Sequence, residues 1–478
     1  MATSNTSKRE QLHIGGDWRA AEEHIEVTDL AEGGRFARVA AATPGDAEDA
    51  LAAAKRAEFD LRETTIVERA DWMHAIADGI DRRSAALAEV IVREAGKPIS
   101  SAESEVASAA ERFRRAAGEI RAMDGEYVEG TTAGHEGWRA IVRHEPVGTV
   151  LCITPYNYPL STTALQVAPA LAAGNAVILK PASKTPVSGA MLAEIIVDTA
   201  PDLPGGAFGF VPGRSGDIGD VLAGDDRLNA IAMTGSSDAG THVASVSAMV
   251  ELHMELGGNA PAVVFPDADL DSAADSAAKG SLKYAGQRCS AVSRVLAHED
   301  IHDDLVARVE AGMADWEPGD LFDPETKLGP LISESQAEWV ETLVEDAVER
   351  GAQVVVGGER DGKLFEPTLL ADVPHDARIV HEEQFGPVVA VTSVADESEA
   401  LAVANGGDLG LDAAVFTSDY DRAMRVAERL DAGGVRINGA PSHGLGDIPF
   451  GGVKDSGIGR EGIGYTIEAF TERKSIIL

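Results

Sequence analysis

Short apolar runs alternate with amphipathic helical segments along most of the chain. The runs suit buried strands, and they lie at residues 149–154, 176–179, 207–211, 230–234, 262–265, 354–356, 388–394, 413–417 and 435–438. Segments with helical periodicity include residues 188–199, 271–284, 301–316, 335–350 and 419–430. Buried strands separated by helices are typical of parallel α/β sheets. We therefore expect two α/β lobes that meet near residues 251–258.

Both ends of the chain add to this pattern. Ala-rich segments with charge on one face predict helices at residues 46–59, 67–95 and 103–121. Near the other end, a Gly-rich segment at 449–464 precedes a short strand predicted at 473–478. This strand has little neighbouring sequence to pair with, so we expect it to join the sheet of another subunit. The sequence therefore predicts a homo-oligomer, either a dimer or a tetramer.

The charge balance argues against some partners. The 478 residues include 79 Asp and Glu against 41 Lys and Arg, which gives a net charge of −38. Such a chain repels phosphate backbones, so nucleic acid is not expected as a partner. The carboxylates are spread along the sequence, which favours adaptation to high salt over a single surface for a basic partner or cation.

Other features limit the location and the kind of site. No run approaches the roughly 18 apolar residues of a membrane span, and the first residues lack the apolar core of an export signal. We therefore expect a cytoplasmic protein without a membrane partner. Two cysteines exclude a disulfide framework and a Cys-only metal site, and no metal is expected. Cys152 lies in an apolar run and is expected in the core, whereas Cys289 follows polar residues.

Residues 457–462 match the Gly-x-Gly-x-x-Gly pattern of dinucleotide-binding loops. That pattern indicates a dinucleotide site only where a strand precedes it and a βαβ unit of about 30 residues contains it. Only 16 residues follow Gly462, which is too few for such a unit. We interpret the segment as a Gly-rich loop with close backbone packing.

A set of short motifs follows the predicted strands in a characteristic order, and Cys289 comes 34 residues after Glu255. The other motifs are PYNYP at 155–159, LKPAS at 179–183, MTGS at 233–236, ELGG at 255–258, EEQFGP at 382–387 and PFGGVKDSG at 449–457. In these motifs and their spacing, the chain resembles the NAD(P)-dependent aldehyde dehydrogenase superfamily from about Gly15 to the end.

The resemblance implies an α/β fold with three parts. These are a Rossmann-like coenzyme domain, an α/β catalytic domain and a small β oligomerisation arm. The coenzyme domain would comprise residues 1–122 and 143–254, the catalytic domain residues 255–443, and the arm residues 123–142 and 464–478.

The resemblance also implies the chemistry. Cys289 would be the nucleophile, since its thiolate can form a thiohemiacetal that expels hydride and leaves a thioester. Asn157, together with the backbone N–H of Cys289, would stabilise the oxyanion. Glu255 would be the general base for hydrolysis of the thioester. Superfamily members that transfer the acyl group to coenzyme A typically lack this carboxylate, so Glu255 favours release of a free acid.

The expected cofactor is NADP or NAD. Lys180 resembles the residue that binds the adenosine ribose, and Ser183 stands where strict NAD members often carry a glutamate. Without that carboxylate a 2′-phosphate is admitted, so both coenzymes stay open. The other positions that match coenzyme contacts are Gly235 and Ser236 at the pyrophosphate, Gly213 near the adenine, Glu383 at the nicotinamide ribose and Phe385 beside the nicotinamide.

The expected partner is a small-molecule aldehyde. Its pocket is predicted from Tyr158, Arg288, Ser290, His443 and Phe450. Arg288 directly before Cys289 is similar to the arrangement in non-phosphorylating glyceraldehyde-3-phosphate dehydrogenases, where Arg and Tyr help to hold the phosphate. A guanidinium beside the nucleophile suits an anionic substrate.

Other features keep further substrates open. Ser108 stands where that subfamily places another arginine, although Arg112, Arg114 and Arg115 are nearby. Residues 329–370 are similar to archaeal lactaldehyde dehydrogenases. The candidate substrates are therefore glyceraldehyde 3-phosphate, lactaldehyde, and succinic or 2-oxoglutarate semialdehyde.

Two functions without catalysis are less well supported. A non-catalytic binding member of the family would be expected to lack the nucleophile, the base or the oxyanion donor, and this sequence retains Cys289, Glu255 and Asn157. A solute-binding protein with two α/β lobes would normally carry an export signal. The sequence therefore favours an enzyme.

Overall fold

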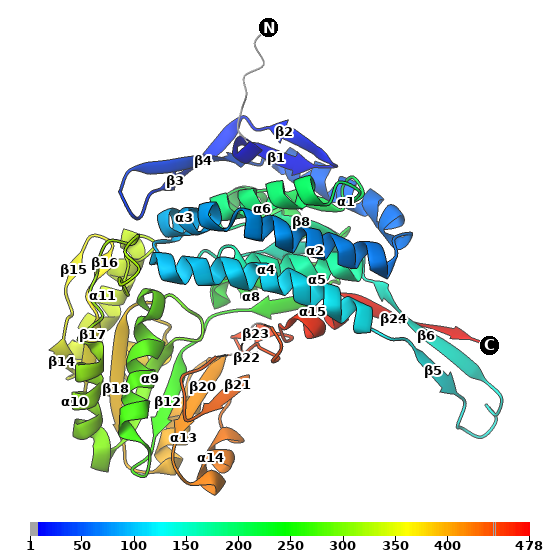
Figure 1. Cartoon of the computed structure of the whole chain (residues 1–478). Helices are drawn as coiled ribbons and strands as arrows, with labels where there is room; N and C mark the ends of the chain where they lie inside the picture. Colours follow the sequence, from blue (N-terminus) through cyan, green and yellow to red (C-terminus); the bar gives the residue numbers. More distant parts are fainter. Residues whose placement is uncertain (1–7, 443, 445) are drawn as a thin grey trace.

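The computed structural model describes residues 8–442, 444 and 446–478, which form two α/β lobes and a protruding arm (Figure 1). The first lobe contains an eight-stranded sheet in the order β2-β1-β9-β8-β7-β10-β11-β23. Its five central strands, β9 to β11, run parallel, and the outer three pair antiparallel. The strands are β1 (Gln11–Ile14), β2 (Asp17–Ala20), β7 (Thr149–Ile153), β8 (Ala176–Lys180), β9 (Phe208–Phe210), β10 (Ala230–Thr234), β11 (Glu251–Glu255) and β23 (Gly457–Ile458). A separate hairpin is formed by β3 (Glu23–Thr28) and β4 (Arg35–Ala41).

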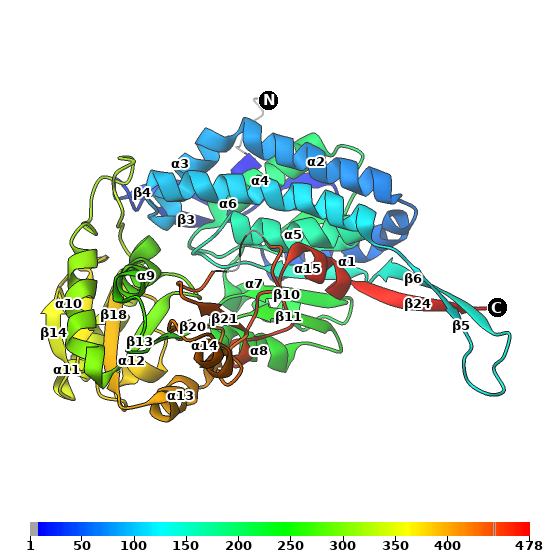
Figure 2. The same cartoon turned by 60° about the horizontal axis from the view of Figure 1, so that its bottom comes forward.

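Ala-rich helices cover this sheet because their small apolar residues recur on one face. In α4, Ala102, Val106, Ala109 and Phe113 are buried in the same core as the central strands. α2 and α4 pack side by side over the lobe (Figure 2). The helices are α1 (Pro44–Arg62), α2 (Ile66–Arg82), α3 (Ser84–Ala95), α4 (Ile99–Ala122), α5 (Ser161–Ala173), α6 (Pro186–Thr199), α7 (Ser215–Ala223), α8 (Ser237–Val246) and α15 (Ile463–Ala469).

The second lobe contains a seven-stranded sheet in the order β14-β17-β18-β13-β12-β20-β21, in which all strands but β14 are parallel. The strands are β12 (Ala260–Val264), β13 (Val292–His298), β14 (Gln353–Val356), β17 (Thr368–Ala371), β18 (Val388–Val394), β20 (Asp412–Phe416) and β21 (Gly434–Ile437). The helices are α9 (Leu270–Leu282), α10 (His302–Met313), α11 (Glu334–Glu349), α12 (Arg378–His381), α13 (Glu397–Asn405) and α14 (Tyr420–Ala427). Short strand pairs join β15 (Arg360–Asp361) to β16 (Leu364–Phe365) and β19 (Leu409–Gly410) to β22 (Val453–Lys454).

The predicted α/β architecture is confirmed, with differences in detail. The helix expected at 67–95 is two helices, because the backbone leaves the helical region at Arg83. The helix expected at 271–284 ends at Leu282, and Tyr284 and Ala285 have positive φ angles. The structure also adds strands that the sequence did not predict, such as β13 and β17. Among the described residues, no helix is long and apolar enough to cross a membrane.

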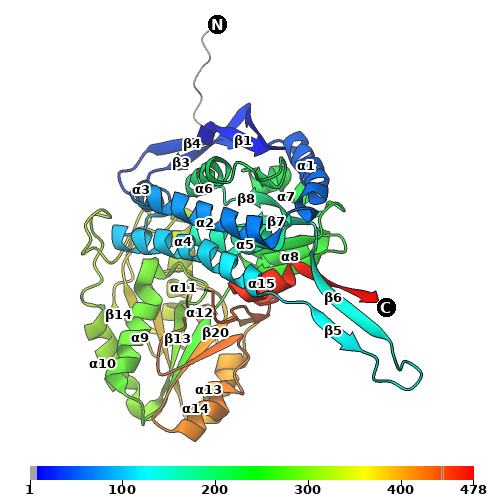
Figure 3. The same cartoon turned by 45° about the vertical axis from the view of Figure 1, so that its right-hand side comes forward.

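The arm is a three-stranded antiparallel sheet in the order β24-β6-β5, built from β5 (Glu126–Glu129), β6 (Arg139–Pro146) and β24 (Thr471–Ile477). It extends away from both lobes (Figure 3). The expectation that the last strand lacks a partner in its own chain was wrong, since β24 pairs with β6 along its whole length. That partner is more than 300 residues away in the sequence, where local pattern gives no sign of it.

One face of the arm carries an apolar row across its three strands. Tyr127 pairs with Ile141, which pairs with Ile476, and their side chains are 59%, 42% and 40% exposed. Assembly into a dimer or tetramer stays a prediction, which this row supports because such a surface gains from burial against another chain. The domain limits also stay predictions. The limit predicted between the arm and the coenzyme domain, at residue 142, falls inside β6, which continues to Pro146.

Candidate active site

The carboxyl ends of parallel strands in the first lobe carry many of the predicted site residues. Parallel strands place these ends along one edge of the sheet, which is where α/β proteins bind ligands. At this edge β7 leads to Asn157, β8 ends at Lys180, β10 leads to Gly235 and Ser236, and β11 ends at Glu255.

The second lobe adds the loops before β13 and β18. Cys289 lies just before β13, while Glu383 and Phe385 lie before β18. The backbone N–H of Gly258 donates to Glu383 Oε1 at 2.8 Å. A Cβ on Gly258 would lie 2.1 Å from the carbonyl oxygen of Cys289, so only glycine permits this close approach. The ELGG motif therefore holds both loops of the second lobe against the end of β11.

Two cavities meet at this edge of the sheet. One, of about 520 Å³, contains most of the predicted coenzyme residues, and the other, of about 370 Å³, contains predicted substrate residues. Asn157, Thr234, Glu255 and Cys289 line both cavities. The structure thus brings the predicted nucleophile, base and oxyanion donor together at the junction of the two cavities.

Cys289 and Glu255 both line the junction of the two cavities, and their side chains interact electrostatically. Burial raises the pKa of the Cys289 thiol, and the adjacent Glu255 charge raises it further. Burial also raises the pKa of Glu255 well above the ordinary value, and so does the neighbouring carboxylate of Glu461. Both groups therefore favour their protonated forms until a reaction step removes the proton.

Asn157 is buried and fixed at both ends of its side-chain amide. Its Nδ2 donates to the Gln287 carbonyl oxygen at 2.9 Å, and its Oδ1 accepts from the Tyr158 N–H at 3.1 Å. An amide nitrogen carries two protons, so one N–H is still available to a ligand. Because Gln287 is two residues before Cys289, this contact ties Asn157 to the segment that holds the thiol.

The larger cavity suits a dinucleotide. Lys180, Ser183, Gly235, Ser236, Glu383 and Phe385 line it, whereas Gly213 lies behind Ser183 and accepts its hydroxyl hydrogen bond at 3.3 Å. Burial lowers the pKa of Lys180 to about 8, and its Nζ donates to Ser215 Oγ at 3.1 Å. Ser236 caps the N-terminus of α8, where backbone N–H groups favour anionic oxygens. Sequence analysis missed Gln336 and Trp339, which reach this cavity from α11.

The model of the aldehyde dehydrogenase family matches residues 18–476. The chain belongs to the aldehyde dehydrogenase family. It is therefore an enzyme that oxidises aldehydes with NAD(P), and the resemblance noted in the sequence is confirmed.

Individual members of the aldehyde dehydrogenase family match along nearly their full length. The NADP-dependent glyceraldehyde-3-phosphate dehydrogenase of Streptococcus equinus is 37% identical, covering 98% of this chain and 99% of that protein. The lactaldehyde dehydrogenase of Methanocaldococcus jannaschii is 34% identical, covering 98% and 100%. The crystal structure of the NADP-dependent glyceraldehyde-3-phosphate dehydrogenase of Bacillus halodurans, complexed with NADP, is 34% identical with a TM-score of 0.96 and covers 98% of this chain and 99% of that one.

The smaller cavity of this aldehyde dehydrogenase holds most of the predicted substrate residues. Tyr158, Arg288, Ser290 and Phe450 line it, and His443 lies outside the described residues. Nη2 of Arg288 lies 3.4 Å from the carbonyl oxygens of Gly280 and Ser290, which makes both contacts weak. Within the described chain, its Nε has no hydrogen-bond partner.

α4 supplies further lining residues beyond the five predicted for the substrate pocket. Ser104, Ser108 and Arg112 face the cavity from one side of this helix, as their spacing of four residues requires. Arg112 is 8% exposed and donates to the Ser161 carbonyl oxygen. Lys97, Glu105, Lys283 and Glu461 also line the cavity. Their residue types alone resemble a solvated charged surface, and only the fold places them here.

Proposed function

We propose that this enzyme converts an aldehyde to a free carboxylic acid through a covalent intermediate on Cys289. The observation that carries the proposal is the junction of the two cavities, which Asn157, Glu255 and Cys289 line together. An aldehyde in the smaller cavity and a coenzyme in the larger one would meet at the sulfur.

The first half of the reaction forms a carbon–sulfur bond. Glu255 in its deprotonated form, which lines the same cavity junction as the thiol, accepts the thiol proton, and the Cys289 thiolate attacks the carbonyl carbon. The carbonyl electron pair moves to oxygen, where the free N–H of Asn157 stabilises the charge. NAD(P), when bound in the larger cavity, supplies the acceptor for the hydride that leaves this adduct. Loss of hydride leaves a thioester on Cys289.

The second half of the reaction hydrolyses the thioester. Glu255, after releasing its first proton to solvent, removes a proton from water, and the resulting hydroxide attacks the acyl carbon. The carbon–sulfur bond then breaks, the acid leaves, and the sulfur regains a proton. Glu255 lines both cavities together with Cys289, which supports both of its proposed proton transfers.

Two substitutions test this chemistry. Cys289→Ser should lower turnover about 10³-fold or more, because a hydroxyl is a far weaker nucleophile here. Glu255→Gln should release at most one equivalent of reduced coenzyme and then stall, since hydrolysis loses its base. Rapid-mixing measurements of NADPH absorbance distinguish the two results. Cys152→Ala, which alters the buried cysteine on β7, is the matched control and should retain turnover. Sustained turnover by Cys289→Ser would contradict the proposal.

We further propose that the substrate is a small anionic aldehyde such as glyceraldehyde 3-phosphate. Arg112, Lys283 and Arg288 line the smaller cavity, and within the described residues no carboxylate lies within ion-pair distance of any of them. Glu105 in this cavity is paired with Lys97, and burial raises the pKa of Glu255 and Glu461, so the three cations still favour a ligand that supplies negative charge. The similarity to the Streptococcus equinus enzyme supports the same substrate class. Succinic and 2-oxoglutarate semialdehydes are also small anionic aldehydes.

Lactaldehyde is the second candidate, supported by the relative from Methanocaldococcus jannaschii and by the hydroxyls of Ser104 and Ser108 on the cavity wall. Arg288→Gln separates the two substrate classes. For an anionic substrate, kcat/KM for glyceraldehyde 3-phosphate should fall about 10-fold to 100-fold more than kcat/KM for lactaldehyde or propanal. Arg114→Gln, which alters a half-buried arginine paired with Asp78 and Asp81, is the control. Equal losses for charged and uncharged aldehydes would favour lactaldehyde.

A further inference from the structure

Lys97 is a buried cation to which the proposed chemistry gives no role. It lies at the junction of α3 and α4 and is 1% exposed. Its ammonium group lies 3.4 Å from the centre of the Tyr158 ring and 4.4 Å from the centre of the Tyr284 ring, and it forms an ion pair with Glu105. All four residues line the substrate cavity. The ammonium group is thus enclosed by one carboxylate and two aromatic rings.

Stability alone does not account for a charge at this position. Removing an ammonium group from water is costly, and a buried ion pair is often no more stable than apolar side chains of similar size. Burial accordingly lowers the pKa of Lys97 to about 8. Contact with the faces of two aromatic rings stabilises the charged form in return. The buried charge of Lys97 is therefore better explained by the way it positions the neighbouring residues.

On one side, the Lys97 cluster holds the segment that carries Asn157. Glu105 Oε1 accepts hydrogen bonds from the backbone N–H groups of Leu160 and Ser161, at 3.0 and 3.1 Å, where α5 begins. The Tyr158 ring packs on the ammonium group, and the Tyr158 N–H donates to Asn157 Oδ1. The loop from Asn157 to the start of α5 is therefore fixed by contacts on both sides of Lys97.

On the other side, the cluster holds the segment that carries Cys289. Tyr284 and Ala285 adopt φ angles of 57° and 50°, which are unfavourable for residues with side chains. The α3–α4 junction holds Tyr284 in this conformation, because the hydroxyl donates to the Ala95 carbonyl oxygen at 2.8 Å and the ring packs on Lys97. Tyr284 in turn accepts the Gln287 N–H at 3.0 Å through its backbone oxygen. Gln287 is the residue whose carbonyl accepts from Asn157.

We propose that Lys97 is a positioning residue that fixes Asn157 relative to Cys289 by holding Tyr158 and Tyr284 on one ammonium group. The inference rests on the roles proposed for Asn157 and Cys289. Loss of the cation would free both tyrosines and the strained turn at Tyr284. The oxyanion donor and the nucleophile would then be aligned less often, while the coenzyme cavity, which Lys97 does not line, would keep its residues.

Lys97→Met tests the proposal, since methionine has a similar length without the charge. We expect kcat and kcat/KM to fall together by about 30-fold to 100-fold, because displacing the reacting groups by up to about 1 Å has an effect of this size. KM and the affinity for NADP should change less than about 3-fold. The rate of the NADPH burst should fall as kcat does, while its amplitude stays near one equivalent per folded subunit. Lys97→Arg, which keeps the charge over the two rings, should recover at least part of the burst rate.

Two further variants keep the test decisive. Lys279→Met removes an exposed lysine paired with Asp275 on α9 and should leave the burst rate unchanged. Glu105→Gln removes the paired charge but keeps an oxygen for Leu160 and Ser161, so it gives a second measurement if Lys97→Met does not fold. A reduced burst amplitude with a wild-type burst rate would show a purely structural role and overturn the proposal, as would a wild-type kcat. Turnover by Cys289→Ser would instead overturn the proposed function.

Discussion

At the scale of single residues, the protonation of Glu255 sets the pH dependence that we expect for turnover. Burial raises the pKa of Glu255, and the charges of Glu461, Glu383 and Asp412 add to the shift. A general base acts only when deprotonated, so kcat should rise with pH as the pH passes through this raised pKa.

Glu461→Gln tests this assignment. Burial raises the pKa of Glu461 to about 7, so near neutral pH it is partly ionised and opposes ionisation of Glu255. Removing that charge should lower the pKa of Glu255 and move the rising limb of the kcat profile toward lower pH. Arg112 should lower the pKa of Glu255 further, because in this variant the Glu461 carboxylate no longer offsets the positive charge of Arg112. The measurement is kcat against pH at saturating substrate. Glu472→Gln, an exposed carboxylate on β24, is the control, and an unshifted limb in Glu461→Gln would contradict the prediction.

The sequence predicted the junction of the cavities better than their walls. Cys289, Glu255 and Asn157 stand in motifs whose order and spacing are characteristic, so they were found without coordinates. Lys97, Glu105 and Arg112 belong to a helical region whose charges resemble solvated ones, and their burial depends on packing against α5 and the Tyr284 turn. Glu461 lies in the Gly-rich segment 457–462, whose glycine pattern indicates close backbone packing and gives no sign that this carboxylate is buried.

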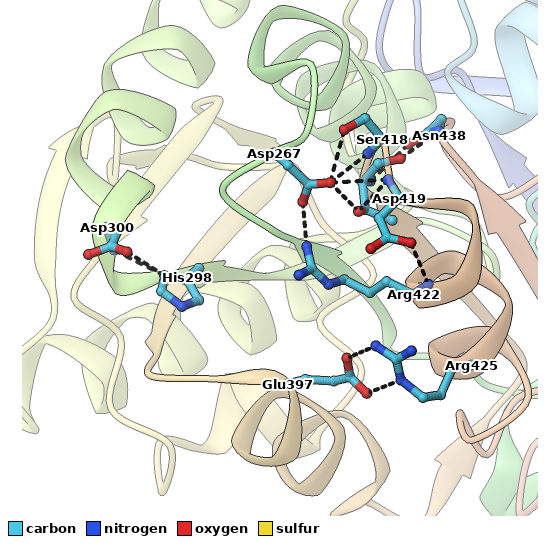
Figure 4. A network of polar contacts seen from close by, with 10 residues as sticks. Asp267, His298, Asp300, Glu397, Ser418, Asp419, Arg422, Arg425 and Asn438 are labelled. Carbon is cyan, nitrogen blue, oxygen red and sulfur yellow. Dashed lines mark hydrogen bonds and ion pairs between the residues drawn. The ribbon is translucent and has the colours of Figure 1, made fainter.

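At the scale of elements, Asp267 joins the loops after β12 and β20 to the start of α14 (Figure 4). Its carboxylate accepts hydrogen bonds from Thr417 Oγ1 at 2.8 Å, from the backbone and hydroxyl of Ser418, and from the Asp419 N–H, and it pairs with Arg422 at 2.6 Å. Burial alone would raise the pKa of Asp267, but these hydrogen bonds and the arginine lower it to about 2. The loops after β12 and β20 are thereby held to the start of α14.

Asp267→Asn should destabilise the fold by about 1–2 kcal/mol near neutral pH, a value that allows for partial solvent screening. Because the pKa is lower in the folded state, the stabilisation is present above the unfolded pKa of about 3.9 and is lost as the pH falls toward 2. The difference in urea midpoint between the two proteins should therefore be largest at pH 5 to 7 and should shrink below about pH 4. Asp421→Asn, an exposed carboxylate on α14, is the control. A difference that is constant with pH would contradict the ionic role.

Helices and strands were predictable where their residues share one local pattern. The runs that became β7, β8 and β10 are apolar except for one residue at an end of each strand, because both faces of these central strands are covered, so their identity follows from the sequence. β13 was missed because Ser293 and Arg294 interrupt its apolar run, although both residues are buried. The fold accommodates Arg294 by letting it donate to the carbonyl oxygens of Asn259, Val403 and Ala404. Those acceptors come from distant segments that no local pattern reveals.

At the scale of the whole molecule, the negative charges far outnumber the positive ones. Ion pairs engage many of the 41 Lys and Arg residues, yet 79 Asp and Glu residues leave a large excess of negative charge on the same surface. Exposed residues such as Glu310, Glu349 and Glu428 have no ion-pair partner among the described residues. Repulsion within this surface opposes the compact state and weakens as salt screens it.

We therefore predict that thermal stability rises with salt. Between dilute buffer and molar KCl the Tm should increase by about 5 °C or more, since a change of about 1 kcal/mol moves the Tm of a domain by about 2–4 °C. The triple variant Glu310→Gln, Glu349→Gln and Glu428→Gln should have a higher Tm in dilute buffer and a smaller increase with salt, because less repulsion is left to screen. Calorimetry at a series of KCl concentrations measures both effects. A Tm that does not change with KCl would mean that the dispersed carboxylates repel one another too weakly to oppose folding, and the acidity would then call for a binding role instead.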